Sequence, residues 1–160
     1  MTPDERLDRF ADLVVRVGAN VQPGQEVVLL YLVEHTLIAR AVTRAALRAG
    51  ALRVHPVISD LHLRKAAIEY GPEAELGRTP EHLLGWIRSW GDTRPALISL
   101  TGDPEPTLFD GLDPELVAKA EARDVRMIYL PFVMGRKLNW VIVAPDRAGV
   151  NRVDADPHLR

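Results

Sequence analysis

The sequence of 160 residues contains no cysteine, which excludes disulfides, thiolate metal sites, cysteine nucleophiles and iron–sulfur clusters. It also lacks a long hydrophobic run. The longest covers residues 27–33, far fewer than the ~20 residues that a membrane-spanning helix needs. Basic residues are not in excess, because 20 Lys and Arg stand against 22 Asp and Glu, so the charge does not indicate nucleic-acid binding. The first residues show no signal-peptide pattern, and we expect a cytoplasmic protein.

Short motifs that bind phosphates or activate serine are absent as well. Neither the G-x-G-x-x-G pattern nor the G-x-x-x-x-G-K-[ST] pattern occurs, so that nucleotide binding could be argued from fold analogy alone. Ser59, Ser89 and Ser99 all lack the flanking glycines of a G-x-S-x-G nucleophile turn. We therefore interpret these serines as ordinary polar residues.

What is present is the composition of a globular protein, with 47% hydrophobic and 26% charged residues. Hydrophobic spacing and capping residues predict helices that begin near Thr2, Thr36, Leu61, Thr79 and Asp113. Apolar runs predict strands at residues 27–33, 54–58, 96–100 and 140–144. Residues 125–134 are compatible with a helix or a strand, because Pro131 interrupts both.

Alternation of strands with helices predicts an α/β fold, with a mostly parallel sheet and helices on both faces. Because Pro56 cannot donate a ladder hydrogen bond, the strand at 54–58 is expected near a sheet edge. Residues 1–145 show no linker and are predicted to form one domain. Residues 146–160 are polar and have no apolar period, which predicts a loose tail.

The sharpest candidate site lies where predicted strands end. Glu34 and His35 follow one strand, Asp60 and His62 follow the next, and the carboxyl ends of parallel strands meet at the edge where ligands usually bind. Capping, which needs no ligand, is the interpretation that we favour: Asp60 would cap the following helix, and Glu34 would favour the start of its own. The sequence has no H-E-x-x-H motif to support a metal.

Trp86 and Trp90 are four residues apart on a predicted helix. That spacing places both rings on one face, which could cover either a core or a partner surface. Core packing is the interpretation that we favour.

Several segments, taken in order, resemble the opening of the thermophilic leucyl aminopeptidases of the aminopeptidase T and PepS type. The most specific is G-A-N-V-Q-P-G-Q-E at residues 18–26, within a longer match over residues 10–29. The further matches are the small-residue helix end at 45–51, Ser59-Asp60 with Arg64, Asp103-Pro104, residues 111–115, and Trp140-x-Ile142 before Pro145. Together they extend over nearly all of residues 3–145.

The resemblance implies a Rossmann-like amino-terminal domain of a metal-dependent exopeptidase. In that family, two divalent metal ions (zinc or cobalt) belong to a second, carboxyl-terminal domain, where they would activate water and polarise the scissile carbonyl. None of the family's metal-ligand motifs can be placed on this sequence. The resemblance therefore assigns no catalytic, cofactor-binding or metal-binding residue to the chain, and it breaks off at Asp146.

The first functional hypothesis is thus a scaffold domain or truncated form of a metal-dependent aminopeptidase, inactive alone, in a homodimer or beside a companion catalytic domain. The second is a stand-alone module that binds a small ligand near Glu34, Asp60 and Asp103, where three acids would favour an amine or a cation. The third is a protein-interaction module that exposes an apolar surface. Neither nucleic acid nor a membrane is expected as a partner.

Overall fold

The computed structural model describes residues 2–145, so the predicted tail at 146–160 lies outside the described residues. The described chain divides into two compact units. The first, which we call the sheet unit, comprises residues 2–59, 94–104 and 138–145 of the described chain. The second, the helical unit, comprises residues 60–93 and 105–137.

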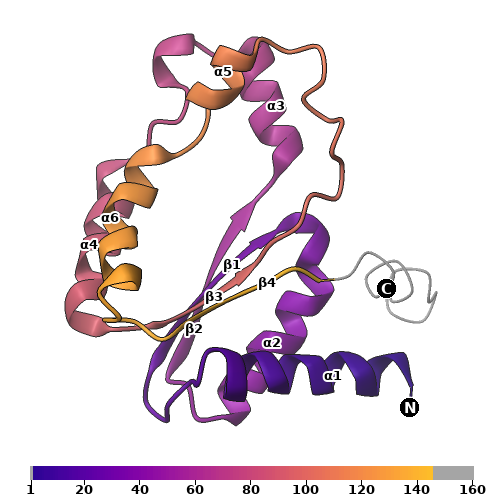
Figure 1. Cartoon of the computed structure of the whole chain (residues 1–160), viewed down its shortest axis with the longest axis vertical. Helices are drawn as coiled ribbons and strands as arrows, with labels where there is room; N and C mark the ends of the chain where they lie inside the picture. Colours follow the sequence, from indigo (N-terminus) through magenta and orange to yellow (C-terminus); the bar gives the residue numbers. More distant parts are fainter. Residues whose placement is uncertain (1, 146–160) are drawn as a thin grey trace. The chain divides into compact units, whose positions relative to one another are not determined.

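The sheet unit is built on four parallel strands in the order β2-β1-β3-β4 (Figure 1). The strands are β1 Glu26–Leu32, β2 Arg53–Ser59, β3 Ala96–Leu100 and β4 Trp140–Val143. This arrangement confirms the α/β class and the parallel sheet predicted from the sequence. The β2 strand lies at one end of the order and carries Pro56, as expected for a residue without a backbone N–H.

The central strand β1 pairs on both sides. Leu29 is in register with Pro56 of β2 and with Ile98 of β3, and it is 1% exposed. Burial from both faces explains why β1 is a continuous apolar run rather than an alternating one. The strand ends one residue earlier than predicted, because Val33 begins a short 3-10 turn, η2 (Val33–His35).

Within this unit α2 (Thr36–Arg48) packs against the sheet, and α1 (Pro3–Leu13) packs against α2. The helix α1 begins with the predicted capping box, in which Glu5 N donates to Thr2 Oγ1 at 3.2 Å and Thr2 N donates to Glu5 Oε2 at 2.7 Å. It continues as a π-helical segment, η1 (Val14–Gly18), so the predicted single helix changes its hydrogen-bond pattern. The helix α2 lies beside α1 (Figure 1).

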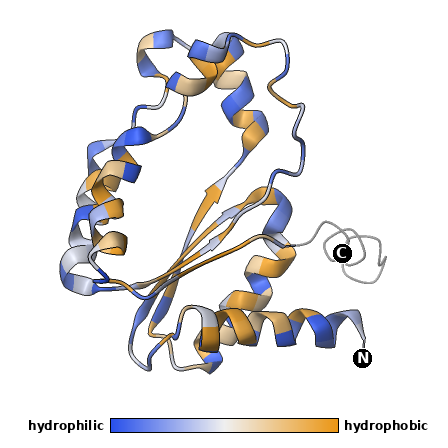
Figure 2. Ribbon diagram, viewed as in Figure 1, coloured by the Kyte–Doolittle hydropathy of each residue, from blue (hydrophilic) through white to orange (hydrophobic). Residues whose placement is uncertain are grey.

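The core of the sheet unit lies between these helices and the sheet. The side of α2 that faces the core consists mainly of small residues, and Ala41, Ala45 and Ala46 are fully buried. Small side chains let the helix approach its neighbours closely. In Figure 2, hydrophobic and hydrophilic residues lie on separate sides of α1 and α2.

The helical unit contains four α-helices and a short 3-10 turn: α3 Leu61–Tyr70, η3 Glu73–Glu75, α4 Glu81–Thr93, α5 Pro114–Lys119 and α6 Arg123–Met134. The ambiguous segment at 125–134 is therefore helical. Pro131 lies inside this helix, where it removes the hydrogen bond from its position to the carbonyl of Met127, four residues earlier.

The helices α4 and α6 pack against each other. On α4 the rings of Trp86 and Trp90 meet edge to face, with centroids 5.2 Å apart, and Trp90 is 2% exposed. Burial of Trp90 confirms the core interpretation of this pair. No helix among the described residues is both long enough and apolar enough to cross a bilayer.

Substitution of Gly18 by alanine tests the contact between η1 and β4. A Cβ at Gly18 would lie 2.9 Å from Cγ2 of Val141, a stiff β-branched side chain, and we expect a loss of about 1–3 kcal/mol in the free energy of unfolding. Gly85→Ala in α4 is the matched control, because a Cβ there meets nothing within 4 Å and should stabilise by about 0.5–1 kcal/mol. Urea unfolding measures both. Equal effects of the two substitutions would contradict the packing described.

Candidate functional site

A buried histidine lies just after the carboxyl end of β1. The strand runs into η2, whose last residue, His35, is the N-cap of α2 and is 5% exposed. Its Nδ1 atom is buried and has no hydrogen-bond partner among the described residues. Such orphaned buried polar atoms are uncommon and call for an explanation, because leaving one unsatisfied costs about 1–3 kcal/mol.

The neighbouring acid shares this property. Glu34 is half-buried, and its Oε2 atom is buried without a hydrogen-bond partner in the described chain. It lies immediately before α2, where a carboxylate interacts favourably with the positive end of the helix. Two consecutive side chains at the end of β1 therefore each keep an unused polar atom.

Just after β3, the backbone passes close to the ring of His35. The Thr101 N–H donates to the Val143 carbonyl at 2.8 Å, after which Gly102 adopts a φ of 144°. A Cβ at Gly102 would lie 3.7 Å from the ring atoms Cε1 and Nε2 of His35. The segments that follow β1 and β3 therefore come close together at His35. The exposed Asp103 comes directly after Gly102.

Asp60 and His62 belong to the helical unit and are engaged there. Asp60 is the N-cap of α3, and its Oδ1 accepts from the N–H groups of His62 at 2.8 Å and Leu63 at 3.2 Å. Its predicted capping role is confirmed. His62 Nε2 lies 2.8 Å from Glu105 Oε1, a pairing across 43 residues of sequence that local motif reasoning could not find.

A second histidine–carboxylate pair lies in the sheet unit, where His55 Nε2 is 3.0 Å from Glu26 Oε2. No motif in the sequence indicates this pair either. Val28 and His55 are in register, so Glu26 lies two residues along the same strand face. Only the register of β1 and β2 reveals this pair.

The residues of each unit do not fit a two-metal centre by themselves. Within either unit, no three described His, Asp or Glu side chains bring their ligand atoms within 4.8 Å of one another. Several of these groups already have partners, as Glu26 and Asp60 show. A hydrolytic centre with two ions requires a larger converging set of ligands than this.

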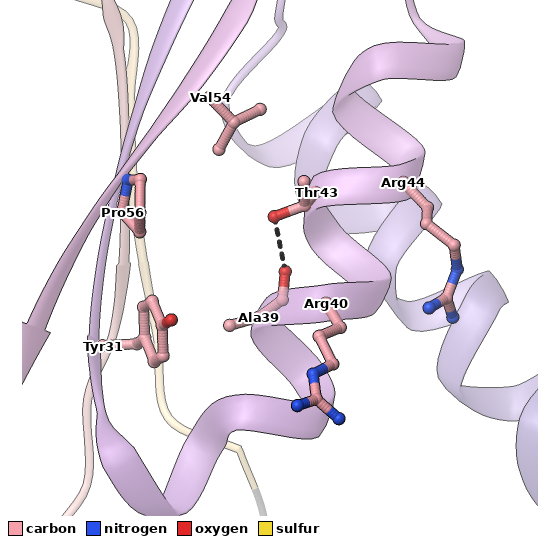
Figure 3. A pocket seen from close by; sticks show the side chains of 7 residues that line it. All are labelled: Tyr31, Ala39, Arg40, Thr43, Arg44, Val54 and Pro56. Atoms are coloured by element: carbon pink, nitrogen blue, oxygen red, sulfur yellow. Dashed lines mark hydrogen bonds between the residues drawn. The ribbon is translucent and has the colours of Figure 1, made fainter.

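A pocket of about 430 Å³ lies elsewhere in the sheet unit, between α2 and the strands β1 and β2 (Figure 3). Seven side chains line it: Tyr31, Ala39, Arg40, Thr43, Arg44, Val54 and Pro56. No motif in the sequence marks it, because its residues come from three separate elements. The only sequence signal for this pocket is the spacing of its residues, which stand at alternate positions on the strands and on adjacent turns of the helix.

Comparison with known proteins identifies relatives of the whole described chain. A family model described as thermophilic metalloprotease (M29) matches residues 3–154. The match includes part of the segment at 146–160, for which the sequence alone shows no family motif. By its description, the family depends on a metal.

The relatives are much longer than this chain. Aminopeptidase T of Thermus thermophilus is 29% identical over 140 residues, which cover 86% of this chain and 34% of the relative. Aminopeptidase 2 of Geobacillus stearothermophilus is 25% identical over 156 residues, covering 96% and 38%. The solved structure of wild-type AmpT from Thermus thermophilus has a TM-score of 0.82 at 27% identity, covering 92% of this chain and 38% of that one. The chain therefore spans little more than a third of the proteins it matches.

Two substitutions of Asp60 separate a capping role from a ligand role. Asp60→Ala should lower the free energy of unfolding by about 1 kcal/mol, whereas Asp60→Asn should leave it nearly unchanged, because asparagine caps as well as aspartate. Urea unfolding with and without millimolar MgCl₂ or ZnCl₂ is the measurement. If an added cation stabilised the wild type and not Asp60→Asn, the carboxylate would be acting as a ligand.

Proposed function

We propose a function that starts from one premise: this chain belongs to the thermophilic metalloprotease (M29) family. It serves as the amino-terminal, sheet-bearing part of a metal-dependent aminopeptidase, an enzyme that releases amino-terminal residues from peptides. On its own it hydrolyses no peptide. A Rossmann-like class for the sheet unit and a cytoplasmic location are parts of the same proposal.

One observation carries this proposal: nearly the whole described chain aligns with about a third of an aminopeptidase and shares the fold of that part. Because a shared fold alone does not transfer an activity, the chemistry must come from a site. Neither unit by itself assembles the ligands for two ions. The remaining two thirds of a full-length relative is the natural place for them.

The divalent ions of such an enzyme would polarise the scissile carbonyl and activate the attacking water. Residues of this chain would act as a support for that chemistry. Parallel strands held on both sides form a rigid platform, and functional groups placed on rigid elements keep their geometry. The platform would position the catalytic part and limit access of peptides to it.

The edge strand β4 offers a surface for that companion part. Its side chains Trp140 and Ile142 are 44% and 59% exposed, and they alternate with Val141 and Val143, which pack against the core. Two large apolar side chains on one face of an edge strand favour a covering partner. The proposed partner is the catalytic part of an M29 enzyme, in a homodimer or in a companion chain.

The absence of peptidase activity is directly testable. Incubated with leucine p-nitroanilide and added Zn²⁺ or Co²⁺, the purified chain should release no p-nitroaniline above the blank. Aminopeptidase T of Thermus thermophilus, assayed under identical conditions, is the positive control. Turnover that is well above the blank and abolished by EDTA would overturn the proposal, because the metal-binding site would then lie within this chain.

A second function is favoured by the unused polar atoms at the end of β1. Glu34 Oε2 and His35 Nδ1 are both buried and unpartnered, and the exposed carboxylate of Asp103 lies at the same sheet edge. Open parallel sheets bind ligands at this edge, at the point where the strand order reverses, which here lies between β1 and β3. Acids repel phosphates there, so the site would take a primary amine or a cation.

Thermal unfolding with a matched pair of compounds tests this second function. Leucinamide carries a primary amine, whereas 4-methylpentanamide has the same apolar body and no amine. At a concentration 100 times its Kd, leucinamide should stabilise by about 2.7 kcal/mol, a rise of roughly 5–10 °C in Tm. The neutral amide should have no effect, and Glu34→Gln should abolish the rise. Equal shifts for both compounds, or none for leucinamide and for added divalent ions, would remove this candidate.

A further inference from the structure

The pocket beside α2 combines an apolar wall with one unengaged cation (Figure 3). At about 430 Å³ it falls within the roughly 300–1,000 Å³ that small-molecule sites typically occupy. Every residue that lines it belongs to the sheet unit. All the side chains that determine the chemistry of the pocket therefore lie in this unit.

Short side chains on α2 leave the space open. Ala39 and Thr43 are one helical turn apart and face the strands, where leucine or isoleucine would otherwise fill the gap. The Thr43 hydroxyl donates to the Ala39 carbonyl at 2.8 Å, which turns its polar atom back onto the helix. The helix side of the pocket consequently presents methyl groups.

The strand side is apolar as well. Val54 and Pro56 are alternate residues of the edge strand β2, and Tyr31 of β1 extends its ring beside them (Figure 3). The Pro56 nitrogen carries no hydrogen, so the strand offers no donor at that position. Tyr31 is half-buried and contributes the one hydroxyl of this wall.

The two arginines of the pocket differ in their engagement. Arg44 Nη2 lies 3.2 Å from Asp8 Oδ1 of α1, and Figure 3 shows its side chain extending away from the strands. Arg40 makes no ion pair with any described residue. Its side chain extends along α2 toward the same end of the pocket as Tyr31 (Figure 3). One guanidinium thus remains available at the mouth of an apolar hollow.

We infer that this pocket binds a small amphipathic carboxylate, whose apolar body contacts Tyr31, Val54 and Pro56 and whose carboxylate pairs with Arg40. A planar guanidinium donates two parallel hydrogen bonds to a carboxylate, which fixes the orientation of the ligand. A single available cation matches a single negative charge better than a phosphate dianion. The inference does not depend on the proposed peptidase role.

Three probes of the same size test the charge requirement on the full 160-residue chain. They are 4-phenylbutyrate, 4-phenylbutan-1-ol and 4-phenylbutylamine, which share an aromatic body and differ only in the terminal group. Isothermal titration calorimetry should give at least tenfold tighter binding for 4-phenylbutyrate than for the alcohol, and weaker binding still for the amine. Inorganic phosphate alone should not bind, because it lacks the apolar body.

Variants then locate the site. Arg40→Gln should weaken 4-phenylbutyrate binding at least tenfold, whereas Arg44→Gln, its neighbour one turn along, should leave the affinity within about twofold. Ala39→Leu should abolish binding by filling the space. Arg40 is exposed, so its replacement is tolerated by the fold and remains informative if Ala39→Leu fails to fold. Failure of the wild type to bind 4-phenylbutyrate, equal binding of the three probes, or equal losses in the two arginine variants would overturn the inference.

Discussion

Burial of the central strand β1 is the constraint on which the rest of the sheet unit depends. Its residues Val27, Val28 and Leu29 are at most 1% exposed, and each such side chain contributes roughly 1.5–3 kcal/mol by leaving water. Because β1 pairs in parallel with both β2 and β3, its direction fixes which ends of all three strands lie at the carboxyl edge. Parallel pairing also requires long crossover connections, and one of these is α2, which supplies the helical wall of the pocket.

The elements that sequence reasoning predicted well are those with strong local signals. The apolar run of β1, the capping box at Thr2 and Glu5, and the Asp60 cap each depend on residues a few positions apart. Pro56 placed its strand at an edge for a purely chemical reason, the missing N–H. In these cases the local preference and the tertiary structure agree, as they do in most natural sequences.

Features that depend on contacts between distant segments could not be predicted. The tight contact of Gly18 with Val141 and the pairs His55–Glu26 and His62–Glu105 need the register or the path of the chain. The helical state of residues 125–134 was ambiguous because Pro131 is unfavourable in either element; in the structure they belong to α6, which packs against α4. Of the candidate site, sequence reasoning located Glu34 and His35 at the end of a strand, but only the structure shows that His35 is buried and lies close to Gly102, just after β3.

The sheet unit presents opposite charges at two places, and this separation has a physical consequence. Glu34 and Asp103 follow β1 and β3, whereas Arg40 lies on the second turn of α2 and lines the pocket. In the two proposals above, an amine binds beside these acids and a carboxylate binds at Arg40. A platform that sorts amines from carboxylates in this way can discriminate between the two ends of a peptide without taking part in its hydrolysis.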